Sequence, residues 1–202
     1  MLNRFRAVFA KVFAPIARFF LRLGISPDAV TIVGTIGVCA GALIFFPRGE
    51  LLVGVLVITA FVFSDAVDGH MARISGQSST WGAFLDSTLD RFGDAAIFGG
   101  LAMYYIGPGS SQNLAALAIY CLVMGSITSY ARARAESLGM EAKGGIAERA
   151  DRLVAILVMT GLSAIFDAPI LIPLTLGVLA VAITITVVQR IMVVRSQAKA
   201  AV

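Results

Sequence analysis

Five aspartates fall within residues 65–94, in two stretches that are otherwise strongly apolar. Asp65 and Asp68 are three residues apart, whereas Asp86, Asp90 and Asp94 follow one another at intervals of four. These spacings put each group on a single face of a helix. Carboxylate oxygens favour hard divalent ions such as Mg²⁺ or Mn²⁺. Facing carboxylates cannot all stay ionised without a cation between them, so the pattern predicts a divalent-metal site.

A carboxylate group of this size can hold two ions, and two ions about 3.5–4 Å apart are a known clamp for a phosphoryl group. Two glycines stand beside the aspartates, Gly69 directly after Asp68 and Gly82 four residues before Asp86. Each glycine either packs against a neighbouring membrane helix or lets a ligand approach the backbone closely. The spacing alone leaves both interpretations open.

The aspartates are unexpected because the chain has the composition of a membrane protein. Hydrophobic residues make up 58% of the 202 residues and charged residues 14%, and the mean hydropathy is +0.90. This composition excludes a cytosolic globular protein and a disordered chain. A charge at the centre of a bilayer costs at least about 2.5–3.5 kcal/mol on insertion scales, so five acids in two neighbouring helices indicate a function.

Six apolar segments approach the length of about 20 residues that a membrane-spanning helix needs. Gly, Pro and Ser clusters separate them, as is typical of turns. The sequence therefore predicts an all-α membrane protein with six transmembrane helices, a catalytic domain over residues 28–195 and a tail at 196–202. The expected helices are Asp28–Phe46, Leu51–Ile74, Gly82–Tyr105, Leu114–Ala135, Asp151–Phe166 and Leu171–Arg190.

Residues 1–27 form a different kind of element, because their apolar side chains recur at helical spacing with Lys and Arg between them. This pattern predicts an amphipathic helix that lies in the membrane interface. Pro15 should kink or split the helix, and Gly24 should end it. Pro27 stands where the first spanning helix starts.

The cations indicate the orientation of the chain, since all but Arg48 and Arg91 fall on one side of the predicted spans. The positive-inside rule places that side, and both termini, in the cytoplasm. At 1.5 Å per residue, Asp65 and Asp90 would each lie about 12–13 Å from the cytoplasmic end of their helices. We therefore expect Asp65 to face Asp90, and Asp68 to face Asp86.

The stretch from Asp65 to Asp90 resembles the D-x-x-D-G-x-x-A-R-x8-G-x3-D-x3-D signature of the CDP-alcohol phosphotransferases, and every fixed position matches. The six-span layout and the amphipathic first helix also resemble this family. The resemblance implies transfer of a phosphoalcohol from a CDP-activated donor, here CDP-diacylglycerol, to an acceptor hydroxyl, with release of CMP. It also implies a bacterial cell-membrane protein with a cytoplasmic active site, a homodimer and no nucleic-acid partner.

The resemblance further implies a role for each matching residue. Asp65, Asp68, Asp86 and Asp90 would bind two divalent cations, Mg²⁺ or Mn²⁺. Asp90 would also be the catalytic base on the acceptor hydroxyl. The start of the first span resembles a family element, P-N-x-x-T, although Asp28 replaces the more common Asn. Binding of the CDP donor would fall to Asp28, Thr31, Gly69, Arg73, Ser79 and Gly82.

The acceptor is indicated by cations that follow the metal motif. Arg132 and Arg134 end the fourth span, Arg149 and Arg152 open the fifth, and Arg190 ends the sixth. Each could simply follow the positive-inside rule or contact anionic lipid. As a set they could bind a second phosphate. An anionic acceptor, inositol phosphate or glycerol 3-phosphate, is then favoured over neutral inositol, serine or choline.

Two further runs, Gly82–Arg91 and Tyr130–Glu136, are similar to the bacterial family members that use inositol phosphate as the acceptor. This similarity implies phosphatidylinositol phosphate as the product, with glycerol 3-phosphate or inositol as alternative acceptors. The acceptor phosphate would be bound by Ser129, Arg132, Arg152 and Arg190. A divalent-cation transporter is a remote alternative, opposed by the one-sided depth of the aspartates and by the lack of an inverted repeat.

Overall fold

The computed structural model describes residues 14–75 and 79–200. Within residues 63–75 it describes the helical backbone but only some of the side chains. The side chains of Asp65, Asp68 and Arg73, and the expected contact at Gly69, lie outside the described part. The predicted facing of Asp65 with Asp90, and of Asp68 with Asp86, therefore stays a prediction.

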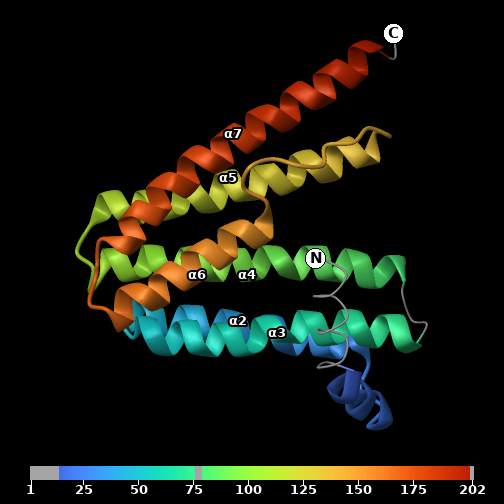
Figure 1. The fold of residues 1–202 in the computed structure, drawn as a ribbon, viewed down its shortest axis with the longest axis horizontal. Coiled ribbons are helices and arrows are strands. Elements are labelled where there is room, and N and C mark those ends of the chain that lie inside the picture. The colour runs from blue at the N-terminus through green and yellow to red at the C-terminus, as the bar shows by residue number, and fades with distance from the viewer. Residues whose placement is uncertain (1–13, 76–78, 201–202) are drawn as a thin grey trace.

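The described chain is helical throughout, with short connections and no strand (Figure 1). Each of the six expected segments is a helix, and a short 3₁₀ helix, η1 (Phe46–Arg48), follows the first of them. The long helices are α2 (Pro27–Phe45), α3 (Leu51–Ser75), α4 (Thr80–Ile106), α5 (Gln112–Ser137), α6 (Arg149–Ile165) and α7 (Leu171–Ala200).

The last helix is longer than predicted, because α7 continues beyond Arg190 to Ala200. The expected tail at 196–202 is therefore helical as far as it is described. The reason is local: after Gly177 the run contains neither Gly nor Pro, and its final turns are made of good helix formers such as Ala, Gln and Lys. The predicted span ended at the charged Arg190, whereas the helix continues through the apolar residues 191–194 and the polar turns that follow.

Side-chain caps fix where the helices that carry the predicted site begin. Ser79 caps α4 by accepting a hydrogen bond from the Gly82 backbone N–H at 2.9 Å. Glu148 and Asp151 form a reciprocal capping box at the start of α6. Pro27 is the first residue of α2, as predicted, and Ser26 caps it. These caps set the register of the first turn of each helix.

Helix α2 packs against both α3 and α4, whereas α5 packs against α4 and α7, and α6 bridges α7 and α3. Glycines permit the close contacts of α2. A Cβ at Gly37 would lie 2.2 Å from the Phe61 ring, and one at Gly41 would lie 3.0 Å from the Ile58 side chain. These two glycines of α2 are therefore packing residues.

Residues 14–22 form a helix that packs against the C-terminal half of α3. Ala17 is fully buried in a small cluster with Val67 and Met71, whereas Phe19 stays largely exposed. Gly24 ends this helix in the left-handed conformation, with φ of +74°. The kink predicted at Pro15 involves residues 1–13, which are outside the described part.

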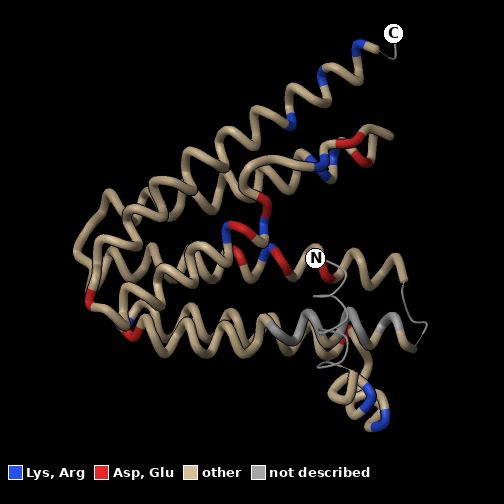
Figure 2. The backbone as a smooth tube through the Cα atoms, in the orientation of Figure 1, with Lys and Arg blue, Asp and Glu red and all other residues tan. Residues whose placement is uncertain are grey.

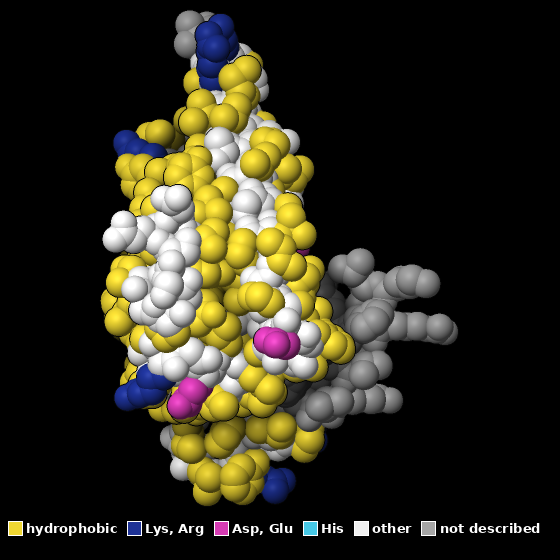
Figure 3. Space-filling model, turned by 90° about the vertical axis from the view of Figure 1, so that its left-hand side faces the viewer, with side chains coloured by type: hydrophobic (Ala, Val, Ile, Leu, Met, Phe, Trp, Pro, Cys, Tyr) yellow, Lys and Arg dark blue, Asp and Glu magenta, His cyan; other side chains and the backbone are white. Residues whose placement is uncertain are grey.

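Among the described residues, three helical segments are long and apolar enough to cross a membrane: Pro27–Arg48, Gln112–Ser137 and Leu171–Ala200. A shorter apolar helix covers Leu51–Val62. Figure 2 shows most Lys and Arg at one end of the bundle, near the ends of α5 and α7 and on the helix at residues 14–22. The opposite end, seen face-on in Figure 3, is mostly hydrophobic with few charges.

Candidate active site

A cavity of about 980 Å³ lies among helices α4, α5, α6 and α7. Its lining includes five arginines, which come from all four of these helices. Six residues that the sequence predicted for the metal and acceptor sites line this one cavity: Asp86, Asp90, Ser129, Arg132, Arg152 and Arg190. The structure therefore places predicted members of both sites around a single space.

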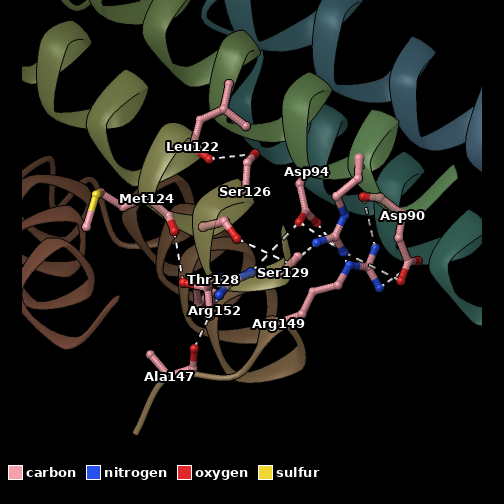
Figure 4. Close-up of polar contacts among 12 residues, drawn as sticks. Asp90, Asp94, Leu122, Met124, Ser126, Thr128, Ser129, Ala147, Arg149 and Arg152 are labelled. Carbon is pink, nitrogen blue, oxygen red and sulfur yellow. Dashed lines mark hydrogen bonds and ion pairs between the residues drawn. The ribbon is translucent and has the colours of Figure 1, made fainter. Parts of the chain in front are cut away.

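The carboxylates of α4 form a row along one helix face. Asp86 is exposed, Asp90 is partly buried, and Asp94 is buried one turn further along the helix. The Asp90 carboxylate forms an ion pair with Arg149, in which Oδ1 and Nη1 are 2.8 Å apart. The same guanidinium donates from Nε to Asp94 Oδ1 at 3.0 Å (Figure 4). Arg149 of α6 thus contacts two successive carboxylates of the row, Asp90 and Asp94.

The sequence assigns no individual role to two arginines of the site, Arg91 and Arg149, although Arg149 belongs to the set of cations that could bind a second phosphate. Arg91 donates from Nη1 to the Ser129 hydroxyl, and its Nη2 lies 3.5 Å from Asp94 Oδ2. The one signal in the sequence was spacing, since Arg149 precedes Arg152 by three residues and so shares its helix face. The pairing of Arg149 with Asp90 and Asp94 of α4 could not be inferred, because these residues are far apart in the chain.

Two predicted acceptor-site arginines are buried and held by backbone carbonyls. Arg152 is 2% exposed, and its Nη1 donates to the Ala147 carbonyl at 3.3 Å. Arg190 is 5% exposed, and it donates to the carbonyls of Gly144 at 3.1 Å and Thr128 at 2.6 Å. Such fixed guanidinium groups suit recognition of phosphate, because the planar fork is already oriented. Arg195, which also lies on α7, does not line the cavity.

The connection between α5 and α6 brings these carbonyls to the arginines. Gly145 has φ of +131°, and a Cβ there would lie 2.3 Å from Cγ2 of Thr186 on α7. The Ala147 N–H also donates to the Thr186 hydroxyl at 3.1 Å. Glycine is therefore required at this close approach, for both conformational and steric reasons. The connection is therefore held against α7 beside the residues whose carbonyls accept from Arg190 and Arg152.

The predicted donor-binding residues that the structure describes in full, Asp28, Thr31, Ser79 and Gly82, lie at the beginnings of α2 and α4. A Cβ at Gly82 would lie 3.4 Å from Ser79 Oγ and 3.7 Å from Asp28 Oδ1, so the three residues adjoin. Trp81, which the sequence analysis missed, donates from Nε1 to Asp28 Oδ2 at 3.1 Å. Thr31 is buried, and its hydroxyl donates to the Pro27 carbonyl at 3.1 Å.

Of the four predicted metal ligands, Asp86 and Asp90 have described side chains. They lie one helical turn apart and line the same cavity, and both supply oxygen donors. This half of the set fits a hard divalent ion. Among the described side chains, no three Asp, Glu, His or Cys residues form a complete metal site.

Comparison with known proteins agrees with this geometry. The family model described as CDP-alcohol phosphatidyltransferase matches residues 24–188. A phosphatidylinositol phosphate synthase of Streptomyces avermitilis is 51% identical, over 98% of this chain and 84% of its own length. One of Cutibacterium acnes is 54% identical, over 96% of this chain and 98% of its own length. The chain belongs to the CDP-alcohol phosphatidyltransferase family.

Solved structures share the fold. The phosphatidylinositol phosphate synthase of Mycobacterium tuberculosis with CDP-DAG bound has a TM-score of 0.88 at 41% identity, covering 92% of this chain and 94% of that one. The complex of the same enzyme with manganese and citrate has a TM-score of 0.84 at 42% identity, covering 90% and 88%. The helical arrangement described above is therefore that of an enzyme family with metal-containing members.

Proposed function

We propose that this protein transfers the phosphatidyl group of CDP-diacylglycerol to a hydroxyl of inositol phosphate, releasing CMP and forming phosphatidylinositol phosphate. The observation that carries the proposal is the single cavity where acidic residues of the family signature meet buried arginines of α6 and α7. The first group suits metal-assisted chemistry on a pyrophosphate, and the second suits an anionic acceptor. The names of the relatives, and the CDP-DAG bound to one of them, support the same reaction.

Two divalent cations, Mg²⁺ or Mn²⁺, would be held by Asp65, Asp68, Asp86 and Asp90. When bound, they supply positive charge to the pyrophosphate and to the departing CMP. The oxygen donors of Asp86 and Asp90 in the cavity support this assignment, as does the manganese complex of the mycobacterial relative.

Asp90 would act as the general base. Its carboxylate faces the cavity, where it can accept the proton of the acceptor hydroxyl. The hydroxyl oxygen then bonds to the phosphatidyl phosphorus, the bond from that phosphorus to the CMP oxygen breaks, and CMP leaves with the bonding electrons. The Asp90 carboxylate also forms an ion pair with Arg149, with Oδ1 and Nη1 2.8 Å apart.

Ser129, Arg132, Arg152 and Arg190 would bind the phosphate of the acceptor. They reach the cavity from three helices, so they can surround a phosphate on several sides. Asp28, Thr31, Gly69, Arg73, Ser79 and Gly82 would hold the cytidine and the phosphates of the donor.

The membrane placement follows from the same features. We propose that all six long helices span the cell membrane of a bacterium, with the cavity and both termini on the cytoplasmic side. The gathering of Lys and Arg at one end of the bundle supports this orientation (Figure 2). We also propose a homodimer, which rests on the family resemblance alone.

The reaction is tested with the purified protein, CDP-diacylglycerol and Mn²⁺ or Mg²⁺. Inositol phosphate, glycerol 3-phosphate, inositol and serine are offered separately, and the CMP released is measured. Inositol phosphate should give the highest kcat/KM, and a chelator should abolish turnover until a divalent ion is restored. Turnover only with serine or free inositol would overturn the anionic acceptor. Preference for glycerol 3-phosphate would reassign the acceptor within the same family.

Trp81 tests the donor site. Replacing it by Phe keeps an aromatic ring but removes the indole N–H that holds Asp28. The KM for CDP-diacylglycerol should rise about three- to tenfold, as expected for one exposed hydrogen bond, while the KM for inositol phosphate stays the same. Phe84→Leu, which alters the exposed ring next to Trp81, is the control. An unchanged donor KM in Trp81→Phe would remove Trp81 from this site.

A further inference from the structure

Asp94 is the carboxylate of α4 to which neither the metal site nor the proton transfer gives a role. It lies one turn beyond Asp90 and is 5% exposed. Its two oxygens contact guanidinium groups of three arginines from α4 and α6. Oδ1 accepts from Arg149 Nε at 3.0 Å, whereas Oδ2 lies 3.5 Å from Arg91 Nη2 and 3.9 Å from Arg152 Nη2 (Figure 4).

The three arginines need a common anion because of where they lie. Arg152 is almost fully buried, and a buried guanidinium is destabilising unless it is paired. Three like charges that converge on one point also repel each other. Asp94 is the anion that all three share, so its loss would leave them without their common partner.

The geometry also fixes how the arginines are turned. With Nε held by Asp94, the guanidinium plane of Arg149 presents Nη1 to Asp90. Arg152 is held between Asp94 and the Ala147 carbonyl. Arg91 is held between Asp94 and the Ser129 hydroxyl, which is itself a proposed phosphate ligand. Each arginine thus has one side on Asp94, and all three also line the cavity.

We propose that Asp94 is a positioning residue that orients Arg91, Arg149 and Arg152 for the acceptor phosphate and thereby sets the preference for a phosphorylated acceptor. This proposal rests on the proposed function. Asp94 does not touch the reacting atoms in this assignment, because its oxygens are occupied by the three arginines. Its effect should therefore fall on binding of the acceptor and not on the chemical step.

The test is Asp94→Asn, which keeps the size of the side chain and removes its charge. The KM for inositol phosphate should rise about 10- to 100-fold, the loss expected for charge-assisted hydrogen bonds. The kcat and the KM for CDP-diacylglycerol should change little, and the preference for inositol phosphate over inositol should fall. Asp167→Asn is the matched control, since Asp167 lies in the connection between α6 and α7 and Asn tolerates its φ of +49°.

An unchanged KM for inositol phosphate, or equal rises for both substrates, would overturn the proposal. If Asp94→Asn does not fold, Arg149→Lys decides the question, because it keeps the positive charge but replaces the planar fork, whose Nη1 contacts Asp90 and whose Nε contacts Asp94, by a single ammonium nitrogen. A wild-type acceptor KM in that variant would overturn the proposal too. If the wild-type protein itself does not use inositol phosphate, the proposed function fails, and that result is distinguishable from an effect of Asp94.

Discussion

Replacing Asp90 by Asn is expected to reduce phosphatidyl transfer by at least about a thousandfold, the range for loss of a general base that also binds metal. The amide keeps the shape of the side chain but cannot take a proton from the acceptor hydroxyl. It also offers a single neutral oxygen in place of a charged carboxylate. Arg149 loses its partner at 2.8 Å yet keeps its hydrogen bond to Asp94, so the fold around α4 and α6 should persist.

The measurement is CMP release at saturating donor and acceptor over a range of Mn²⁺ concentrations. Asp167→Asn again serves as the control, since it makes the same chemical change away from the cavity. Thermal unfolding of the two variants should agree within a few degrees. If Asp90→Asn retains more than about a tenth of the wild-type kcat, the general-base assignment is wrong.

The second large effect is expected from Arg152→Gln, which should raise the KM for inositol phosphate by about 100-fold or more. Arg152 is 2% exposed, so a phosphate bound there would interact with it away from bulk water. Glutamine can still donate toward the Ala147 carbonyl, and Asp94 keeps Arg91 and Arg149 as partners. The variant therefore removes a positive charge without leaving a buried carboxylate unpaired.

Arg134→Gln is the matched control for this variant. Arg134 lies on the exposed end of α5, bonds to Ser137 and does not line the cavity. Its replacement should leave both Michaelis constants unchanged. For Arg152→Gln, the KM for CDP-diacylglycerol should also stay at the wild-type value. A rise in the donor KM alone would mean that Arg152 serves the donor site.

The helices could be predicted because local features define them. Apolar length, Pro27 at the start of α2, and Gly and Ser clusters between segments placed all six long helices close to their observed bounds. The end of α7 could not be placed in this way, since hydropathy marks where a membrane segment stops and not where helical hydrogen bonding stops. After Arg190 the helix continues through the apolar residues 191–194 and then through polar turns to Ala200.

The site could be predicted in part for a similar reason. The row of Asp86, Asp90 and Asp94 follows from spacing within one helix, and spacing is visible in a sequence. The partners of these aspartates are not visible in the sequence, because Arg149 comes from α6 and lies far from Asp94 along the chain. The contact of Trp81 with Asp28 likewise joins two helix starts that only the folded chain brings together.

The connection between α5 and α6 has a consequence for how acceptor affinity can change during evolution. Gly144 and Ala147 present their carbonyls to Arg190 and Arg152, and the same segment is pressed onto α7 at Thr186. The two arginines are therefore not independent, since a sideways shift of α7 would move the carbonyl partners of both together. Substitutions at Thr186, which contacts no substrate in the proposed assignment, could therefore change the affinity for the acceptor while the arginines stay the same.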